Sequence, residues 1–116
     1  MKWNDVWKKN FRYDNYGYIW DGEGTMVFSV DDLTDENDQL MNTFCQNIVN
    51  VLNEKEPFLQ YAGLTIKDGC DLYMNDDMVG SFRGWGHLTG VLHLSDEVAA
   101  KVQDELINYV MGKISK

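Results

Sequence analysis

Two long segments of this chain carry apolar residues three or four positions apart, the spacing of an amphipathic helix, and this pattern constrains the fold most. In the first segment, apolar residues recur from Leu40 to Leu52, after a stretch rich in Asp and Glu. Acidic and N-capping side chains favour the start of a helix, where the helix dipole is positive. The pattern predicts a helix over residues 35–55, with Pro57 preventing its continuation.

The second helix is predicted to begin at Ser95. Serine is a preferred N-cap, and Asp96 and Glu97 follow in what would be the first turn. Apolar residues then recur at helical spacing as far as Ile114, and Lys113 lies where a helix end favours positive charge. Both amphipathic segments therefore need a partner layer that covers one side of them.

Strand-like segments supply that layer. Aromatic and β-branched residues at 16–21 and 25–30 flank a Gly-Glu-Gly loop, and this pattern predicts a β-hairpin. A second hairpin is predicted from residues 70–75 and 78–85, joined at an Asp-Asp turn, and residues 64–66 could add a short strand before it.

The predicted order, ββαββα, indicates a single α+β domain that spans residues 1–116. The two hairpins would form one antiparallel sheet, with both helices packed on one face. The opposite face would then be covered weakly or not at all, so we expect it to be a contact surface. Near the start of the chain, Trp3 and Trp7 would share one side of a short helix and could close an end of the core.

The charge of the chain is strongly negative and uneven. Residues 1–20 hold four basic and two acidic residues, which gives them a net charge of +2. Because the whole chain has a net charge of −9, the other 96 residues carry a net charge of −11. Such a body repels nucleic acid and anionic membranes, because both bind through their phosphate charge. It allows attraction to a basic protein surface. The alternative is that the acidity serves solubility alone.

No membrane span, secretion signal or cofactor motif is found in the sequence. Its apolar runs are shorter than a bilayer requires, and we expect a soluble cytoplasmic protein without a cofactor. Cys45 and Cys70 are predicted to be buried small hydrophobic residues rather than a disulfide or metal ligands. With two histidines and no CxxC pair, a zinc site is not expected.

Residues 81–90, SFRGWGHLTG, place large polar-tipped side chains among glycines. Strand alternation would turn Phe82 toward the helices and place Arg83 and Trp85 together on the open sheet face. Arginine and tryptophan are frequent at binding hot spots. The alternative is a cation–π pair, Arg83 on Trp85 or on a tyrosine, that seals the sheet without a partner. The further members of this predicted patch share one parity in the first hairpin and are Tyr16, Tyr18 and Trp20.

A catalytic interpretation is possible for the same segment. Arg83, His87 and Asp71 could supply a cation, a general base and an orienting carboxylate. The chain, however, has no nucleophile motif, no phosphate-binding loop and no metal-ligand set, so we do not expect an enzyme. A small ligand-binding or catalytic domain would require a concave pocket bounded by Arg83, Trp85 and His87.

The last third of the chain resembles a group of small proteins encoded by bacteriophages and conjugative elements. The residues that carry the resemblance are RGWGHLTG at 83–90, LHLS at 92–95 and AAKVQD at 99–104, and it extends over residues 64–116. The chain departs from the group at residues 91–93, where relatives are richer in glycine. The group has no established activity, so no catalytic residues carry over. The resemblance implies an accessory protein of a mobile element in a bacterial cytoplasm.

In that setting the acidity suggests an interaction protein that is not an enzyme and that binds a basic protein, for example to inhibit a host defence or nucleic-acid-handling protein. Two clusters of carboxylates would form its negative surfaces. The cluster at the start of the first helix consists of Asp31, Asp32, Asp35 and Glu36. The cluster at the second hairpin turn consists of Asp76 and Asp77. A homo-oligomer that hides its open sheet face is the remaining alternative.

Overall fold

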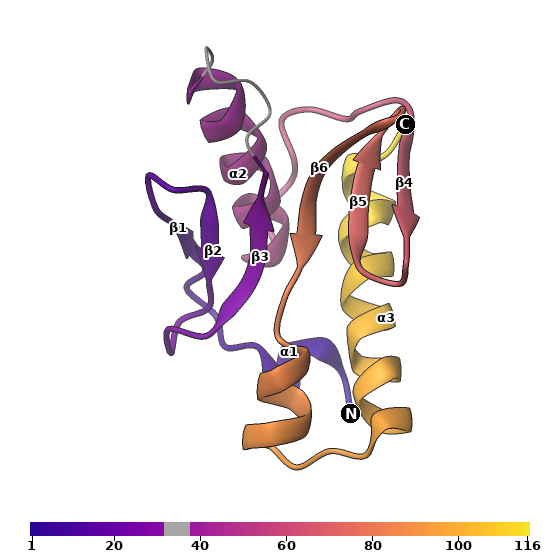
Figure 1. Cartoon of the computed structure of the whole chain (residues 1–116). Helices are drawn as coiled ribbons and strands as arrows, with labels where there is room; N and C mark the ends of the chain where they lie inside the picture. Colours follow the sequence, from indigo (N-terminus) through magenta and orange to yellow (C-terminus); the bar gives the residue numbers. More distant parts are fainter. Residues whose placement is uncertain (32–37) are drawn as a thin grey trace.

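The computed structural model describes residues 1–31 and 38–116, in which six antiparallel strands form one sheet beside the helices (Figure 1). The order across the sheet is β1-β2-β3-β6-β5-β4. The strands are Arg12–Tyr13 (β1), Tyr18–Trp20 (β2), Met26–Val30 (β3), Leu64–Lys67 (β4), Asp71–Met74 (β5) and Asp77–Phe82 (β6). The helices are Trp3–Val6 (α1), Asp38–Leu52 (α2) and Asp96–Ile114 (α3), with a π-helix at His87–Val91 (η1).

The α+β class and the antiparallel sheet are confirmed, but the order ββαββα is wrong. Each half of the chain contributes three strands, α1 precedes the first three, and η1 lies between β6 and α3. The strand missing from the prediction is β1, where Arg12 pairs with Trp20 and Tyr13 pairs with Ile19. Two residues are too few to show alternation, so only the pairing with β2 defines this strand.

One face of the sheet forms the core. Ile19, Phe28 and Phe82 lie side by side on β2, β3 and β6, and all three are buried. The Phe28 and Phe82 rings meet edge to face, with centroids 4.8 Å apart. On β6, Gly80 leaves the space that the Phe28 ring occupies, because a Cβ there would lie 2.5 Å from the ring.

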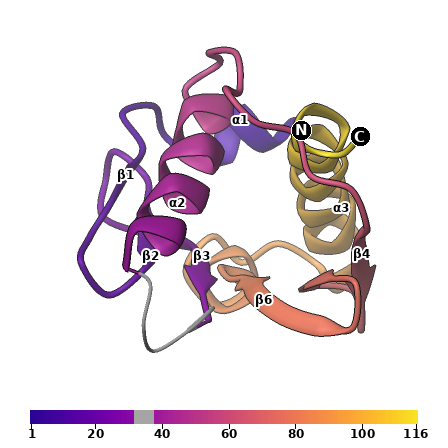
Figure 2. The same cartoon turned by 90° about the horizontal axis from the view of Figure 1, so that it is seen from above.

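Both long helices cover this one face of the sheet (Figure 2), as predicted. The buried side of α2 includes Phe44, Ile48 and Leu52, and that of α3 includes Leu106. The α3 helix begins as expected, with the Ser95 hydroxyl accepting a hydrogen bond from the Val98 amide at 3.2 Å. None of the described helices is both long and apolar enough to cross a membrane.

The α2 helix ends at Leu52, earlier than the predicted residue 55. Glu54 has a φ of 62°, a left-handed conformation that cannot continue a helix. The polar side of α2 then holds the chain that follows: the buried Asn47 side chain accepts a hydrogen bond from the Phe58 amide and donates one to the Leu59 carbonyl. Tertiary contacts thus fix the loop that leads to β4.

The N-terminal segment closes one end of the core, as its tryptophans predicted. Trp3 and Trp7 are both buried, and Trp3 packs against the rings of Phe11 and Tyr109. The buried Asp21 attaches this segment to the β2–β3 turn. Its carboxylate accepts a hydrogen bond from the backbone amide of residue 8 and two more from the amides of residues 23 and 25, at 2.9–3.0 Å.

Candidate functional site

The segment RGWGHLTG leaves the sheet at once. Strand β6 ends at Phe82, three residues before the predicted end of this strand, and η1 begins at His87. Between them Gly84 has a φ of 110°, which favours glycine. A Cβ on Gly84 would lie 2.1 Å from the Trp7 ring, so the fully buried Trp7 indole packs directly on this backbone. The glycine is therefore a packing feature of the fold.

Arg83 lies on the sheet face that carries no helix. Its backbone amide donates a hydrogen bond to the Val27 carbonyl at 2.7 Å, and its Nε donates to the Ser29 hydroxyl at 2.9 Å. Ser29 pairs with Ser81 in the register of β3 and β6, and both side chains alternate with Phe28 and Phe82, which face the helices. Arg83 remains exposed, as predicted for a residue on the open face.

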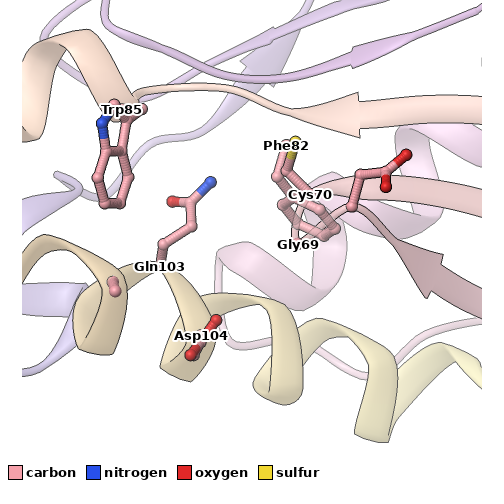
Figure 3. Close-up of a pocket in the computed structure, with 8 residues that line it drawn as sticks. Gly69, Cys70, Phe82, Trp85, Gln103 and Asp104 are labelled. Carbon is pink, nitrogen blue, oxygen red and sulfur yellow. The ribbon is translucent and has the colours of Figure 1, made fainter. Parts of the chain in front are cut away.

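Trp85 does not lie beside Arg83 on the open face. The indole lines a cleft together with Phe82 and with residues of α3, on the helix side of the sheet (Figure 3). The prediction that Arg83 and Trp85 stand together on the open face is wrong, because strand alternation stops at Phe82 and the unusual backbone of Gly84 redirects the chain.

His87 occupies a third environment. Its ring packs on Trp7, with centroids 5.7 Å apart, and it lines a hollow beside α1 whose other members include Asp5 and Glu23. Asp71 accepts a hydrogen bond from the Ser81 hydroxyl at 2.8 Å on the open face. The structure therefore places Arg83, Trp85 and His87 in three separate surroundings: Arg83 bonds to Ser29, Trp85 lines the cleft beside α3, and His87 packs on Trp7.

On the open sheet face, the rings of Tyr16, Tyr18 and Trp20 lie beside one another as predicted, but Trp85 is not part of this patch. The Tyr16 and Tyr18 rings lie 6.3 Å apart, and Tyr18 and Trp20 are also 6.3 Å apart, with their rings edge to face. Tyr16 is 78% exposed. Across the sheet, on β4 and β5, the Lys67 ammonium lies 4.3 Å from the centre of the Tyr73 ring.

Asp14 organises this patch and was not among the residues predicted from the sequence. One carboxylate oxygen accepts hydrogen bonds from the backbone amides of Tyr16 and Tyr18, and the other accepts one from the Trp20 indole at 3.0 Å. Burial alone would raise the pKa of Asp14, but the hydrogen bonds from Trp20 and the two backbone amides outweigh it and lower this pKa. The available signal was an Asp two residues before a Tyr-Gly-Tyr turn.

The predicted acidic clusters are described in part. Asp76 lies in the β5–β6 turn and Asp77 begins β6, both exposed. Asp31 is half-buried, and its amide donates a hydrogen bond to the Val79 carbonyl. The other three predicted residues, Asp32, Asp35 and Glu36, lie outside the described residues.

A cleft between the β4–β5 turn and α3 was not predicted from the sequence (Figure 3). Its volume is about 330 Å³. Gln103 on α3 points into it, is 6% exposed, and has an Oε1 atom without a hydrogen-bond partner in the described structure. The signal was a glutamine on the apolar side of the predicted helix, four residues after Ala99 and three before Leu106. The cleft is lined by Asp68, Gly69, Cys70, Phe82, Trp85, Ala100, Gln103 and Asp104.

The two cysteines are not bonded to each other. Cys45 is buried in α2, as predicted, where burial first and the nearby Asp14 charge second raise the pKa of its thiol to about 12. The prediction that Cys70 is buried is wrong: it is half-buried, because it lines the open cleft. Its thiol also contacts Ser81 and Asp71. Across residues 1–31 and 38–116, no group of His, Cys, Asp and Glu side chains is arranged to hold a metal ion.

Comparisons of the chain with models of protein families, with curated proteins and with solved structures find no match.

Proposed function

We propose that this chain is an interaction protein, not an enzyme, and that its acidic surface binds a basic protein. In keeping with the resemblance at residues 83–104, we place it in the cytoplasm of a bacterial host as an accessory protein of a phage or mobile element. Its target would be a host defence or nucleic-acid-handling protein, which it would inhibit by occupying a basic surface.

The observation that carries this proposal is negative charge left without ionic partners. Among the described residues there are two ion pairs, Lys9–Glu54 and Lys101–Glu97. Many exposed carboxylates lie outside these pairs, and two groups of them bear on the proposal. Asp76 and Asp77 lie at the β5–β6 turn, and Asp68 and Asp104 line the cleft beside α3. Such charges accelerate association with a positive surface and oppose binding to phosphates.

The side chains of Arg83 and His87 lie in separate surroundings, and this supports an interaction role over a catalytic one. A general base and a cation act on one substrate only when both can reach it. His87 packs on Trp7 beside α1, whereas Arg83 is bonded to Ser29 on the open face. These separate contacts favour packing roles for the two side chains over a shared role at one substrate.

Self-association is the second candidate, and the exposed aromatic patch favours it. Tyr16 and Tyr18 present adjacent, tilted rings on a sheet face that carries no helix among the described elements. Exposed aromatic residues are common at interfaces. Light scattering over a range of concentrations tests this candidate: a dimer that Tyr16→Ser returns to a monomer would support it, and a monomer at the highest concentration would remove it.

The main proposal is tested by capture from a nuclease-treated bacterial lysate, with three variants that each remove two negative charges. Asp76→Asn with Asp77→Asn alters the hairpin turn, and Asp68→Asn with Asp104→Asn alters the cleft. The control neutralises two exposed carboxylates elsewhere, at Glu23 and Glu56.

We expect the wild-type chain to retain a basic protein that increasing salt releases, and one of the two test pairs, but not the control, to lose it. Purified target should then lose its nucleic acid when the chain is added. Capture of no basic or nucleic-acid-handling protein would contradict the proposal, as would equal capture by all three variants.

A further inference from the structure

We propose that the cleft between the β4–β5 turn and α3 binds the guanidinium group of an arginine side chain on the protein partner. This inference rests on the proposed function, because it names the chemical group through which a basic partner would be held. Its basis is the combination of residues that three separate elements bring together around one hollow (Figure 3).

Gln103 is the first part of the case. Gln103 is only 6% exposed, and its Oε1 accepts no hydrogen bond from the described residues. A buried carbonyl oxygen without a donor is destabilising, and most such atoms in native proteins have a partner. Leucine or methionine would fill this position on α3 without that cost. A ligand that brings an N–H donor into the cleft would satisfy the atom.

The charge of the lining is the second part. Asp68 enters from the β4–β5 turn and Asp104 from α3, and both side chains are exposed. No Lys, Arg or His is found in the lining among residues 1–31 and 38–116. Neither carboxylate takes part in the ion pairs found among the described residues. The side-chain oxygens of Asp68, Gln103 and Asp104 thus offer hydrogen-bond acceptors to a cation.

The aromatic wall selects the shape of that cation. Trp85 is 44% exposed, so part of its indole is available to a ligand, and Phe82 lies in the same lining. A guanidinium is flat, stacks on aromatic faces and carries five N–H donors in fixed directions. A lysine ammonium is a compact, strongly hydrated charge that cannot stack in this way. Acceptors beside an aromatic wall therefore favour arginine.

The test titrates the full chain with capped tripeptides, Gly-Arg-Gly, Gly-Lys-Gly and Gly-citrulline-Gly, and with free L-arginine. Citrulline is the matched control, because it keeps the planar shape of arginine and lacks its charge. We expect the arginine peptide to bind about tenfold more tightly than the citrulline peptide and about threefold more tightly than the lysine peptide.

Nuclear magnetic resonance spectra of the unmodified chain locate the binding without any substitution. The indole N–H signal of Trp85 and the side-chain amide signals of Gln103 should move with the arginine peptide, while the indole signals of Trp3 and Trp7 stay in place. Movement of other signals only would overturn the proposal. Because this titration uses the unmodified chain, it tests the proposal even if a variant fails to fold.

Three substitutions then measure each part of the cleft. Gln103→Met preserves shape and removes the acceptor, and should weaken binding about tenfold. Trp85→Leu should weaken it about 3- to 30-fold. Asp104→Asn should weaken it about two- to fivefold, whereas Glu105→Gln, the same charge change at the neighbouring exposed position, should leave it unchanged.

Equal binding of the arginine, lysine and citrulline peptides, or unchanged affinity in Gln103→Met, would overturn the assignment. Tighter binding of free L-arginine than of the capped arginine peptide would overturn the proposal that the guanidinium belongs to a side chain of a protein partner. Lysate capture that depends on Asp76 and Asp77, combined with no response of Trp85 to the arginine peptide, would reject the cleft alone and leave the proposed function standing.

Discussion

Gly84→Ala should destabilise the protein severely, although it adds one methyl group to a surface motif. Two costs combine. Alanine is strained at the φ of 110° that residue 84 adopts, at about 1–2 kcal/mol. The new Cβ would also lie 2.1 Å from the Trp7 ring, and Trp7 is fully buried and cannot move without disturbing the core. Overpacking of this kind costs about 1–3 kcal/mol.

Together these costs predict a loss of about 2–5 kcal/mol in the free energy of unfolding, a large part of the stability of a small domain. Urea denaturation followed by circular dichroism measures this loss. The matched control is Gly86→Ala in the same motif. Gly86 has a helical φ of −62°, and a Cβ there meets no atom within 4 Å, so its alanine should be neutral or slightly stabilising.

A double-mutant cycle separates the two costs. In a Trp7→Leu background the ring is absent, so the steric part of the Gly84→Ala penalty should fall by about 1–3 kcal/mol while the backbone part remains. Equal destabilisation by alanine at residues 84 and 86, or a penalty at residue 84 that Trp7→Leu leaves unchanged, would refute the assignment of this glycine to the packing of Trp7.

Three further predictions concern single side chains. Asp21→Ala removes the acceptor of three backbone hydrogen bonds and should lower the free energy of unfolding by about 3 kcal/mol in urea denaturation; little change would contradict its role as the anchor of the N-terminal segment. The folded-state pKa of Asp14 is lowered from 3.8, so its contribution to stability is present above pH 3.8 and is lost as the pH falls through the lower, folded value. Asp14→Asn should therefore make the free energy of unfolding fall less steeply as the pH drops into the acid range, and an unchanged acid dependence would contradict this. A thiol reagent should modify Cys70 in the native chain and reach Cys45 only after unfolding, as mass spectrometry of the labelled chain would show, because Cys45 is buried with a thiol pKa of about 12; equal labelling rates would contradict this.

The acidic surface and the cleft have different consequences for binding. Charge at Asp76 and Asp77 acts over a distance and mainly accelerates encounter, so its effect should fade as salt increases. A guanidinium held against Trp85 and Gln103 would act through close contacts that salt weakens less. The salt dependence of each variant therefore separates attraction by the whole surface from recognition in the cleft.

Local patterns were sufficient to predict the two long helices and most strands, but not η1. Apolar spacing predicted α2 and α3, and Ser95 marked the start of α3 correctly because an N-cap acts within one turn of chain. Alternation and turn residues predicted the two hairpins for the same reason. Parity also predicted the aromatic patch, since Tyr16, Tyr18 and Trp20 follow one another along a single stretch of chain.

Contacts between distant segments decided the rest. The sequence by itself determined the amphipathic elements, the single covered sheet face and the excess negative charge, all of which follow from residues close together in the chain. Only the tertiary structure separated Trp85 from Arg83, because the Trp7 indole occupies the space beside Gly84 and the chain turns there. The cleft arises in the same way, from Asp68, Trp85 and Gln103 on three elements whose proximity depends on how α3 packs against the sheet.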